Sequence, residues 1–257
     1  MIHPSAIISE KATLGKNVKV GPYCVIGDNV KIGDNCDLKS HVVMEGHTDI
    51  GENNIFFPFS AIGLQTQDLK YQGGPTFLKI GNNNTFRENV TVHSSTFEDT
   101  ITSIGNDNLF LAYAHIAHEC VIHNHVIFSN NATVAGHVKV YDHVIISGFG
   151  AIHQFCRIGA HSIIGGCSKI IKDIAPYTTV DGNPANVRGI NTVGLERRGF
   201  ETEDIKALRM AYKKLFLKKD QNLAVLLEAF KDHEATENKY VQELLNFISE
   251  SERGLTR

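Results

Sequence analysis

The sequence has no run of about 18 apolar residues that could cross a bilayer. Its opening Met-Ile-His-Pro-Ser has neither the basic nor the apolar region of a signal peptide. Neither sign of charge dominates, since 25 Lys and Arg stand against 28 Asp and Glu. This balance gives no reason to expect nucleic acid or an anionic membrane as a partner. We therefore expect a cytoplasmic protein without nucleic-acid binding or stable membrane insertion.

Tryptophan is absent, and no two of the five cysteines form a CxxC pair. The missing pair argues against a zinc knuckle. An apolar content of 42% in 257 residues can nevertheless build a large core, so one or two domains are expected.

One period runs through most of the chain, because every sixth residue is aliphatic, Phe or Met. This register holds over positions 2–62, returns over 80–92 and continues over 104–170. A period of six fits neither an α-helix nor an alternating strand, and it is typical of a hexapeptide parallel β-helix. The sequence therefore predicts a mainly β fold, a prism with three hexapeptides per coil. Proteins of this kind usually have left-handed connections, an exception to the right-handed crossover rule.

The sixfold register also predicts the role of four of the five cysteines. These four fall four places after a register residue, in a slot that elsewhere holds mainly Ala and Val: Cys24, Cys36, Cys120 and Cys156. Cysteine can fill such an inward-facing slot as a small hydrophobe. We expect these thiols to be core residues rather than metal ligands or disulfide partners.

Two stretches break the pattern, and a third part follows it. Residues 63–79 and 94–103 place polar residues in the register, so loops extruded from the prism are predicted there. We assign the β-helix to residues 1–190 and a C-terminal α-helical domain to residues 191–257. In that domain Thr202 is expected to cap a helix, and two more helices are expected near 221–233 and 238–251.

Residues 18 apart lie above one another on adjacent coils, about 4.8 Å apart. This rule stacks His118, Gly136 and Gln154, and places Glu119 beside them under His137. An imidazole can remove a hydroxyl proton, and a glycine N–H can stabilise an oxyanion, so the stack is a candidate acyl-transfer site on one wall of the prism. The alternative is a set of ordinary surface histidines on a polar wall.

A second column contains His125, His143 and His161, which are also 18 residues apart. Three stacked imidazoles could bind zinc. No carboxylate partner is evident for each ring, however, so we interpret the column as a polar corner ladder and assign no metal site.

Five motifs then occur in one order: Gln67-Asp68-Leu69-Lys70-Tyr71, His115-Ile116-Ala117-His118-Glu119-Cys120, Asn131-Ala132-Thr133-Val134-Ala135-Gly136-His137-Val138, Ile152-His153-Gln154-Phe155-Cys156 and Arg197-Arg198-Gly199-Phe200. With the C-terminal helices they closely resemble the UDP-N-acetylglucosamine O-acyltransferases, which catalyse the first step of lipid A synthesis. The resemblance covers nearly the whole chain.

The resemblance implies a homotrimer with active sites between neighbouring prisms. It implies transfer of a (3R)-hydroxyacyl group from acyl carrier protein to the 3-hydroxyl of UDP-N-acetylglucosamine, with no cofactor beyond the donor's own phosphopantetheine. His118 matches the family's general base and Gly136 its oxyanion donor. Matches to substrate-binding positions are Gln67, Asp68, Lys70, His93, His115, His137, His153, Gln154, Asn191, Arg197 and Arg198. Gly166 matches the position that measures acyl length.

Two residues depart from the family pattern. Glu119 follows the base where the family mostly has Asp, and Val193 replaces an acidic residue near the uracil. Lys70 is present, whereas variants that use a diamino sugar lack this lysine, which favours an oxygen nucleophile. Two rival hypotheses remain, namely the related N-acyltransferase, which usually has an extra N-terminal uridine-binding domain, and a non-catalytic β-helix used for assembly.

Overall fold

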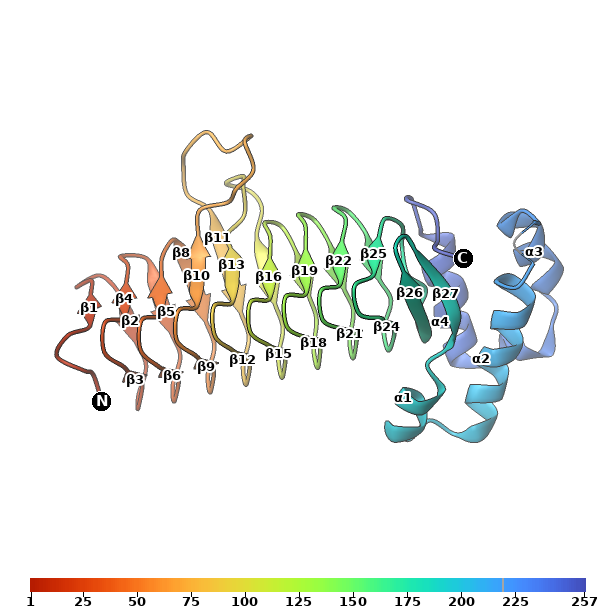
Figure 1. Cartoon of the computed structure of the whole chain (residues 1–257), viewed down its shortest axis with the longest axis horizontal. Coiled ribbons are helices and arrows are strands. Elements are labelled where there is room, and N and C mark those ends of the chain that lie inside the picture. Colours follow the sequence, from red (N-terminus) through yellow and green to blue (C-terminus); the bar gives the residue numbers. More distant parts are fainter. Residues whose placement is uncertain (219) are drawn as a thin grey trace.

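The structure is a computed structural model and describes residues 1–218 and 220–257. The chain forms a left-handed parallel β-helix followed by helices (Figure 1). The hexapeptide prediction is therefore confirmed. Three sheets form the walls of the prism, and we name the turns between them the first corner (first to second wall), the second corner (second to third wall) and the third corner (third to first wall).

Short parallel strands build each wall. The first wall contains β1 (Ile7–Ile8), β4 (Val25–Ile26), β7 (Val43–Met44), β10 (Ala61–Leu64), β13 (Thr91–His93), β16 (His115–Ile116), β19 (Thr133–Val134), β22 (Ala151–Ile152) and β25 (Lys169–Ile170). The second wall contains β2 (Thr13–Leu14), β5 (Val30–Ile32), β8 (His47–Ile50), β11 (Phe77–Ile80), β14 (Thr102–Ile104), β17 (Val121–Ile122), β20 (Lys139–Val140) and β23 (Arg157–Ile158).

The third wall contains β3 (Lys19–Val20), β6 (Asp37–Leu38), β9 (Ile55–Phe56), β12 (Thr85–Phe86), β15 (Leu109–Phe110), β18 (Ile127–Phe128), β21 (Ile145–Ile146) and β24 (Ile163–Ile164). It ends in β26 (Thr178–Gly182), which pairs with β24 in parallel and with β27 (Ala185–Ile190) in an antiparallel hairpin. The period of six does not predict this hairpin.

The register residues fill the interior of the prism. Along the third wall the rings of Phe56, Phe86, Phe110 and Phe128 lie on successive coils, with centroids 4.8, 4.8 and 5.2 Å apart. The four cysteines assigned to the small slot are fully buried free thiols, as predicted. The first coil has no coil before it to cover it, and Ile2 is 54% exposed.

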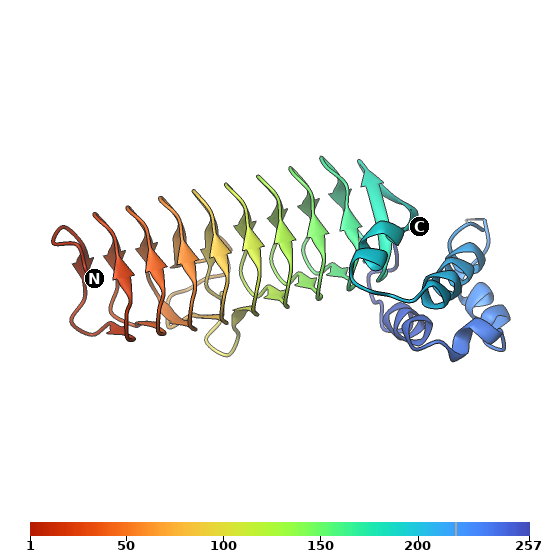
Figure 2. The same cartoon turned by 90° about the horizontal axis from the view of Figure 1, so that it is seen from below.

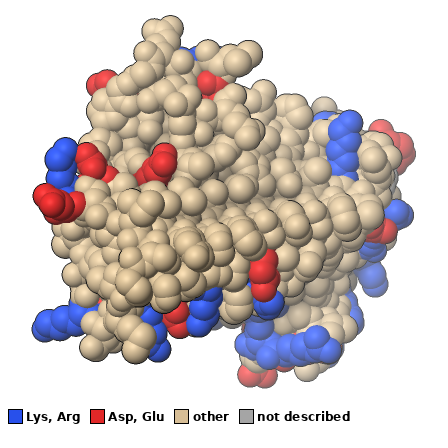
Figure 3. All heavy atoms as spheres, turned by 60° about the vertical axis from the view of Figure 1, so that its left-hand side comes forward, with Lys and Arg blue, Asp and Glu red and all other residues tan. Residues whose placement is uncertain are grey.

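Both polar interruptions leave the prism at the first corner. The chain departs between β10 and β11 at residues 65–76 and between β13 and β14 at residues 94–101. The inserted residues stretch the spacing between stacked positions, so that Ala61 pairs with Thr91 and Thr91 with His115. The two loops stand above the prism in Figure 1, and the protrusion at the top of Figure 3 is a largely uncharged surface.

The helices lie beyond the last coil (Figure 2). They are α1 (Thr192–Arg197), α2 (Thr202–Leu215), α3 (Leu223–Phe230), the 3-10 helix η1 (Glu234–Glu237) and α4 (Lys239–Ser249). Of the helices in the described part of the chain, none has the length and apolarity to cross a membrane. Thr202 is not the cap of α2, contrary to the prediction: Glu201 has the extended backbone of an N-cap, and Thr202 already lies in the first turn.

Candidate active site

A cleft of 600 Å³ opens at the first corner, between the loop at 65–76 and the first wall. The loop contributes four consecutive residues, and β13, β16 and β19 with the turns that follow them contribute most of the rest. Its lining comprises Gln67, Asp68, Leu69, Lys70, His93, His115, Ala117, His118, Thr133, Val134, Ala135, Gly136 and Gln154. Eight residues that the sequence assigned to catalysis or substrate binding are therefore brought together in one place.

The candidate base His118 lies in the turn after β16 and so belongs to a corner of the prism. The spacing of 18 had placed it on a wall, and this part of the prediction is wrong. The strands of this wall are short, and β16 ends at its register residue Ile116. The chain has therefore already entered the turn at His118, two residues later. His118 Nδ1 hydrogen-bonds to Glu119 Oε2. Because a carboxylate only accepts, Nδ1 is the donor, and the Nε2 lone pair is left for a substrate proton. Nε2 lies 3.9 Å from Asp68 Oδ2 across the cleft.

Glu119 is 8% exposed and has a left-handed backbone with φ of 53°. The loop at 94–101 holds its other oxygen, because Oε1 accepts hydrogen bonds from the Thr96 backbone N–H and from the Thr100 hydroxyl at 2.8 Å. Its own N–H donates to Thr102 Oγ1 at 2.8 Å. Burial raises the pKa of this carboxyl, but these hydrogen bonds and the one to His118 leave the pKa below its ordinary value. Glu119 is therefore a fixed anion behind the base.

The sequence did not identify the threonines that hold Glu119. They belong to a loop outside the sixfold register, so no spacing rule relates them to position 119. The two loops are also joined to each other, because the Thr66 and Thr96 hydroxyls lie 3.1 Å apart. Asp68 is oriented in turn by its backbone N–H, which donates to Thr66 Oγ1 at 3.1 Å.

Gly136 lies on the next coil, directly above the base. A Cβ at this position would collide with the imidazole of His118, so only glycine allows the ring and the backbone to approach this closely. The stack of His118, Gly136 and Gln154 proposed from the spacing of 18 is present, with all three residues lining the cleft.

His93 and His115 form the floor of the cleft, with ring centroids 4.8 Å apart. Burial, with the neighbouring histidines, lowers the pKa of His93 to about 4 and also lowers the pKa of His115. Both rings are therefore neutral near pH 7 and act as hydrogen-bonding groups. Thr91 Oγ1 lies 2.7 Å from His115 Nδ1. Within the described residues the buried Nδ1 of His93 has no partner.

Two other expected residues lie just outside the cleft. His137 lines an adjoining pocket with Phe155 and Arg157, and its Nε2 is 3.9 Å from Glu119 Oε2. His153 Nδ1 lies 3.3 Å from the Arg253 guanidinium. This second pocket is bounded by residues from the end of the chain, which the sixfold register could not place.

The residues expected at the nucleotide end lie at the second corner. Asn191 is 4% exposed, caps α1 and donates to the His161 carbonyl at 2.8 Å. Arg198 donates to the His143 carbonyl at 3.3 Å. These carbonyls belong to the ladder of His125, His143 and His161, whose rings stack with centroids 4.7 Å apart. Arg197 is the last residue of α1.

Gly166 lies at the third corner, between β24 and β25, and is exposed. A Cβ there would meet only the Gly148 carbonyl oxygen, at 3.5 Å. One chain thus presents the base, the expected nucleotide residues and the expected acyl-length position at three different edges of the prism.

Comparisons with known proteins bear directly on this arrangement. A model described as bacterial transferase hexapeptide repeats matches residues 11–46 and 101–136, and one described as UDP-N-acetylglucosamine O-acyltransferase, domain 2, matches residues 173–256. The acyl-(acyl-carrier-protein)–UDP-N-acetylglucosamine O-acyltransferase of Akkermansia muciniphila is 53% identical over 253 residues, which cover 98% of each chain. The chain belongs to the UDP-N-acetylglucosamine O-acyltransferase family.

Solved structures agree with this membership. LpxA, a UDP-N-acetylglucosamine acyltransferase from Bacteroides fragilis, superposes with a TM-score of 0.97 at 36% identity over the full length of both chains. LpxA from Acinetobacter baumannii gives a TM-score of 0.95 at 44% identity, covering 100% of this chain and 99% of the other. The resemblance inferred from the motifs is therefore confirmed at the level of the family and the fold.

Proposed function

We propose that this member of the UDP-N-acetylglucosamine O-acyltransferase family transfers a (3R)-hydroxyacyl group from acyl carrier protein to the 3-hydroxyl of UDP-N-acetylglucosamine, in the cytoplasm, as the first step of lipid A synthesis. One observation carries the mechanism. His118 faces the cleft with Nε2 while Nδ1 is bound to the fixed anion of Glu119.

In the proposed reaction Nε2 of His118 accepts the proton of the sugar hydroxyl as its oxygen attacks the thioester carbonyl. A carbon–oxygen bond forms, and the carbonyl electron pair moves to its oxygen, where the Gly136 N–H stabilises the negative charge. Glu119 stabilises the imidazolium. Collapse of the intermediate breaks the carbon–sulfur bond, and His118 returns the proton to the phosphopantetheine thiol. The chemistry needs no cofactor besides that carrier arm.

We further propose that the working unit is a homotrimer. Asn191, Arg197 and Arg198 lie at the second corner, whereas His118 lies at the first. One sugar nucleotide can contact both sets only if the second corner of a neighbouring prism faces the first corner of this one. Guanidinium groups there suit a diphosphate. In this arrangement Gly166, at the third corner, would face the acyl chain.

The test of the activity is release of thiol from hydroxyacyl carrier proteins of graded acyl length. We expect release that requires UDP-N-acetylglucosamine and is slower with its 3-amino analogue, because Lys70 matches the oxygen-specific pattern. A mixture without sugar nucleotide measures background hydrolysis. Absence of turnover with every donor length would reject the acyltransferase assignment. A preference for the 3-amino sugar would instead identify the protein as an N-acyltransferase.

The acyl-length role gives a separate prediction for Gly166→Met. A methionine side chain at this exposed position should fill the acyl groove and shift the preferred donor to a shorter chain, with kcat for the shorter donor retained. The check is the ratio of kcat/KM for short and long donors in the variant and the wild type. Gly189→Ala, where an added Cβ meets nothing within 4 Å, serves as a control. An unchanged ratio in Gly166→Met would exclude the assignment.

A further inference from the structure

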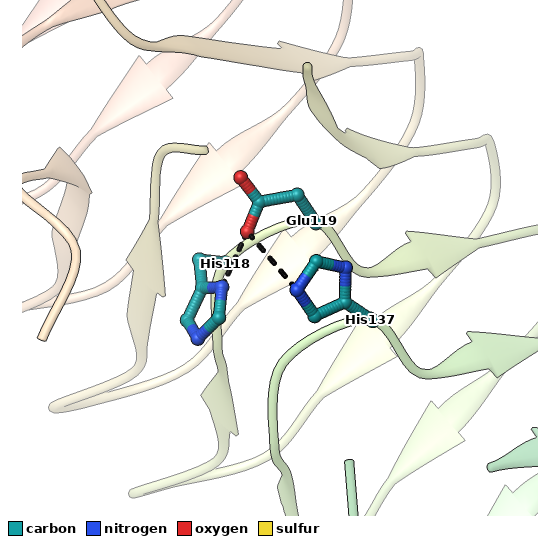
Figure 4. Close-up of side chains that lie close together, drawn as sticks. All are labelled: His118, Glu119 and His137. Atoms are coloured by element: carbon teal, nitrogen blue, oxygen red, sulfur yellow. Dashed lines mark hydrogen bonds and ion pairs between the residues drawn. The ribbon is translucent and has the colours of Figure 1, made fainter. Parts of the chain in front are cut away.

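Three potential metal-ligating side chains meet beside the cleft (Figure 4). His118 and His137 lie on either side of the Glu119 carboxyl group, and the three ligand atoms lie within 4.8 Å of one another. Nδ1 of His118 and Nε2 of His137 both face the same oxygen, Oε2. Over residues 1–218 and 220–257, no other group of three His, Cys, Asp or Glu side chains converges in this way.

We propose that this cluster binds a divalent transition metal, with Zn²⁺ as the best fit, and that the bound ion switches the enzyme off. Two imidazoles and one carboxylate form a ligand set common in zinc proteins, with a fourth position open to water. Ligand atoms about 2.1 Å from a tetrahedral ion lie about 3.4 Å from one another. The observed 3.9 Å between His137 Nε2 and Glu119 Oε2 is close to that distance. His118 Nδ1 and Oε2 are hydrogen-bonded, so the ion must displace the proton between them and move these two atoms apart.

The surroundings hold the ligands in place. Glu119 is anchored through Oε1 by Thr96 and Thr100, and its other oxygen, Oε2, accepts the hydrogen bond of His118 Nδ1, which the ion would replace. The ring of His137 stacks on Phe155 with centroids 4.5 Å apart. The rings of His118 and His137 are perpendicular, so their ligand nitrogens approach the carboxylate from two directions. Supporting contacts of this kind orient ligands in known metal sites.

Inhibition follows from where the imidazole proton must go, and this part of the inference rests on the proposed function. A neutral imidazole has a single ring proton. A metal on Nδ1 of His118 leaves that proton on Nε2, the atom that faces the substrate. Nε2 then has no lone pair to accept the sugar hydroxyl proton. The ion also takes the Glu119 oxygen that would stabilise an imidazolium. The base therefore cannot act.

The direct test is titration of the metal-free, full-length protein with Co²⁺, followed by displacement with Zn²⁺. We expect one Co²⁺ ion to bind per chain, with the visible absorption of a four-coordinate ion. The Zn²⁺ concentrations that displace Co²⁺ should also lower kcat. Addition of EDTA should restore kcat. Loss of an outer-shell partner weakens metal binding about 10–100-fold, so loss of a direct ligand in His137→Ala should weaken it by at least about 100-fold. Circular dichroism checks the fold, and His137→Gln keeps the size of the side chain.

His143→Ala is the matched control, because it removes an imidazole from the separate ladder at the second corner. Its Co²⁺ affinity should equal that of the wild type. Binding that is insensitive to both His137 variants, or that is lost in His143→Ala, would overturn the site. Full kcat at saturating Zn²⁺ would overturn the inhibition. The Co²⁺ spectrum needs no turnover, so it tests the site even if the proposed acyl transfer fails.

Discussion

His118→Ala is expected to lower kcat by about 10²–10⁴-fold, the usual contribution of a positioned general base. The alanine leaves Glu119 and its hydrogen-bond partners in place, but no side chain remains there to accept the proton of the sugar hydroxyl. KM for UDP-N-acetylglucosamine should change little, because the loop at 65–76 and the floor histidines remain. Steady-state kinetics at saturating donor measures both constants.

The control for this change is His125→Ala, which removes another corner histidine whose described ring contact is with His143. It should have wild-type kcat. Thermal unfolding and sedimentation of both variants separate a loss of chemistry from a loss of structure. A wild-type rate in a folded His118→Ala protein would remove the base assignment.

Glu119→Gln is expected to be as damaging, although it changes only one atom. The backbone N–H of Thr96 points at Oε1, so the amide oxygen of a glutamine must take that position. Its NH₂ group then faces His118 Nδ1 and donates to it, which forces the ring proton onto Nε2. The same carboxylate-to-amide change in a serine protease triad costs about 10⁴-fold in kcat through the wrong tautomer.

The comparison that identifies this effect is Glu119→Asp. Aspartate keeps the acceptor and the charge but shortens the arm, so it should recover much of the rate lost in Glu119→Gln. A merely structural role predicts the opposite order, because glutamine preserves the size and the hydrogen bonds to Oε1 and aspartate does not. kcat for Glu119→Gln above that for Glu119→Asp would therefore contradict the positioning role.

Much of the fold could be predicted from the sequence because the buried residues of the prism repeat strictly. Each register position fixes one inward-facing side chain, so the three walls, the buried cysteines and the stack of His118 under Gly136 all follow from counting. The hairpin of β26 and β27 could not be predicted, since it lies after the period ends. Thr202 was misassigned as a cap because the capping preferences of Thr and its neighbour Glu201 do not show where helical backbone begins.

The active site was only partly accessible to the same reasoning. Counting places His118 beneath Gly136 with Glu119 beside it, although it puts them on a wall rather than at a corner. It cannot show that Thr96 and Thr100 hold the carboxylate, since loop conformation depends on contacts outside the repeat. The arginines and Asn191 were assigned by resemblance alone. The structure places them along a different edge, a separation that follows from the three-walled geometry of the fold.

Both loops leave the prism at the corner that holds the base, on the two coils immediately before it. Apart from an irregularity between Ile62 and Leu64, where the first loop leaves, the strands before and after the loops pair in the regular register of their walls. The height of His118 and Gly136 along the prism is therefore independent of how long the loops are. The length and composition of the loops can therefore change, and with them the substrates that fit the cleft. The relative positions of His118 and Gly136, which set the geometry of proton transfer, stay the same.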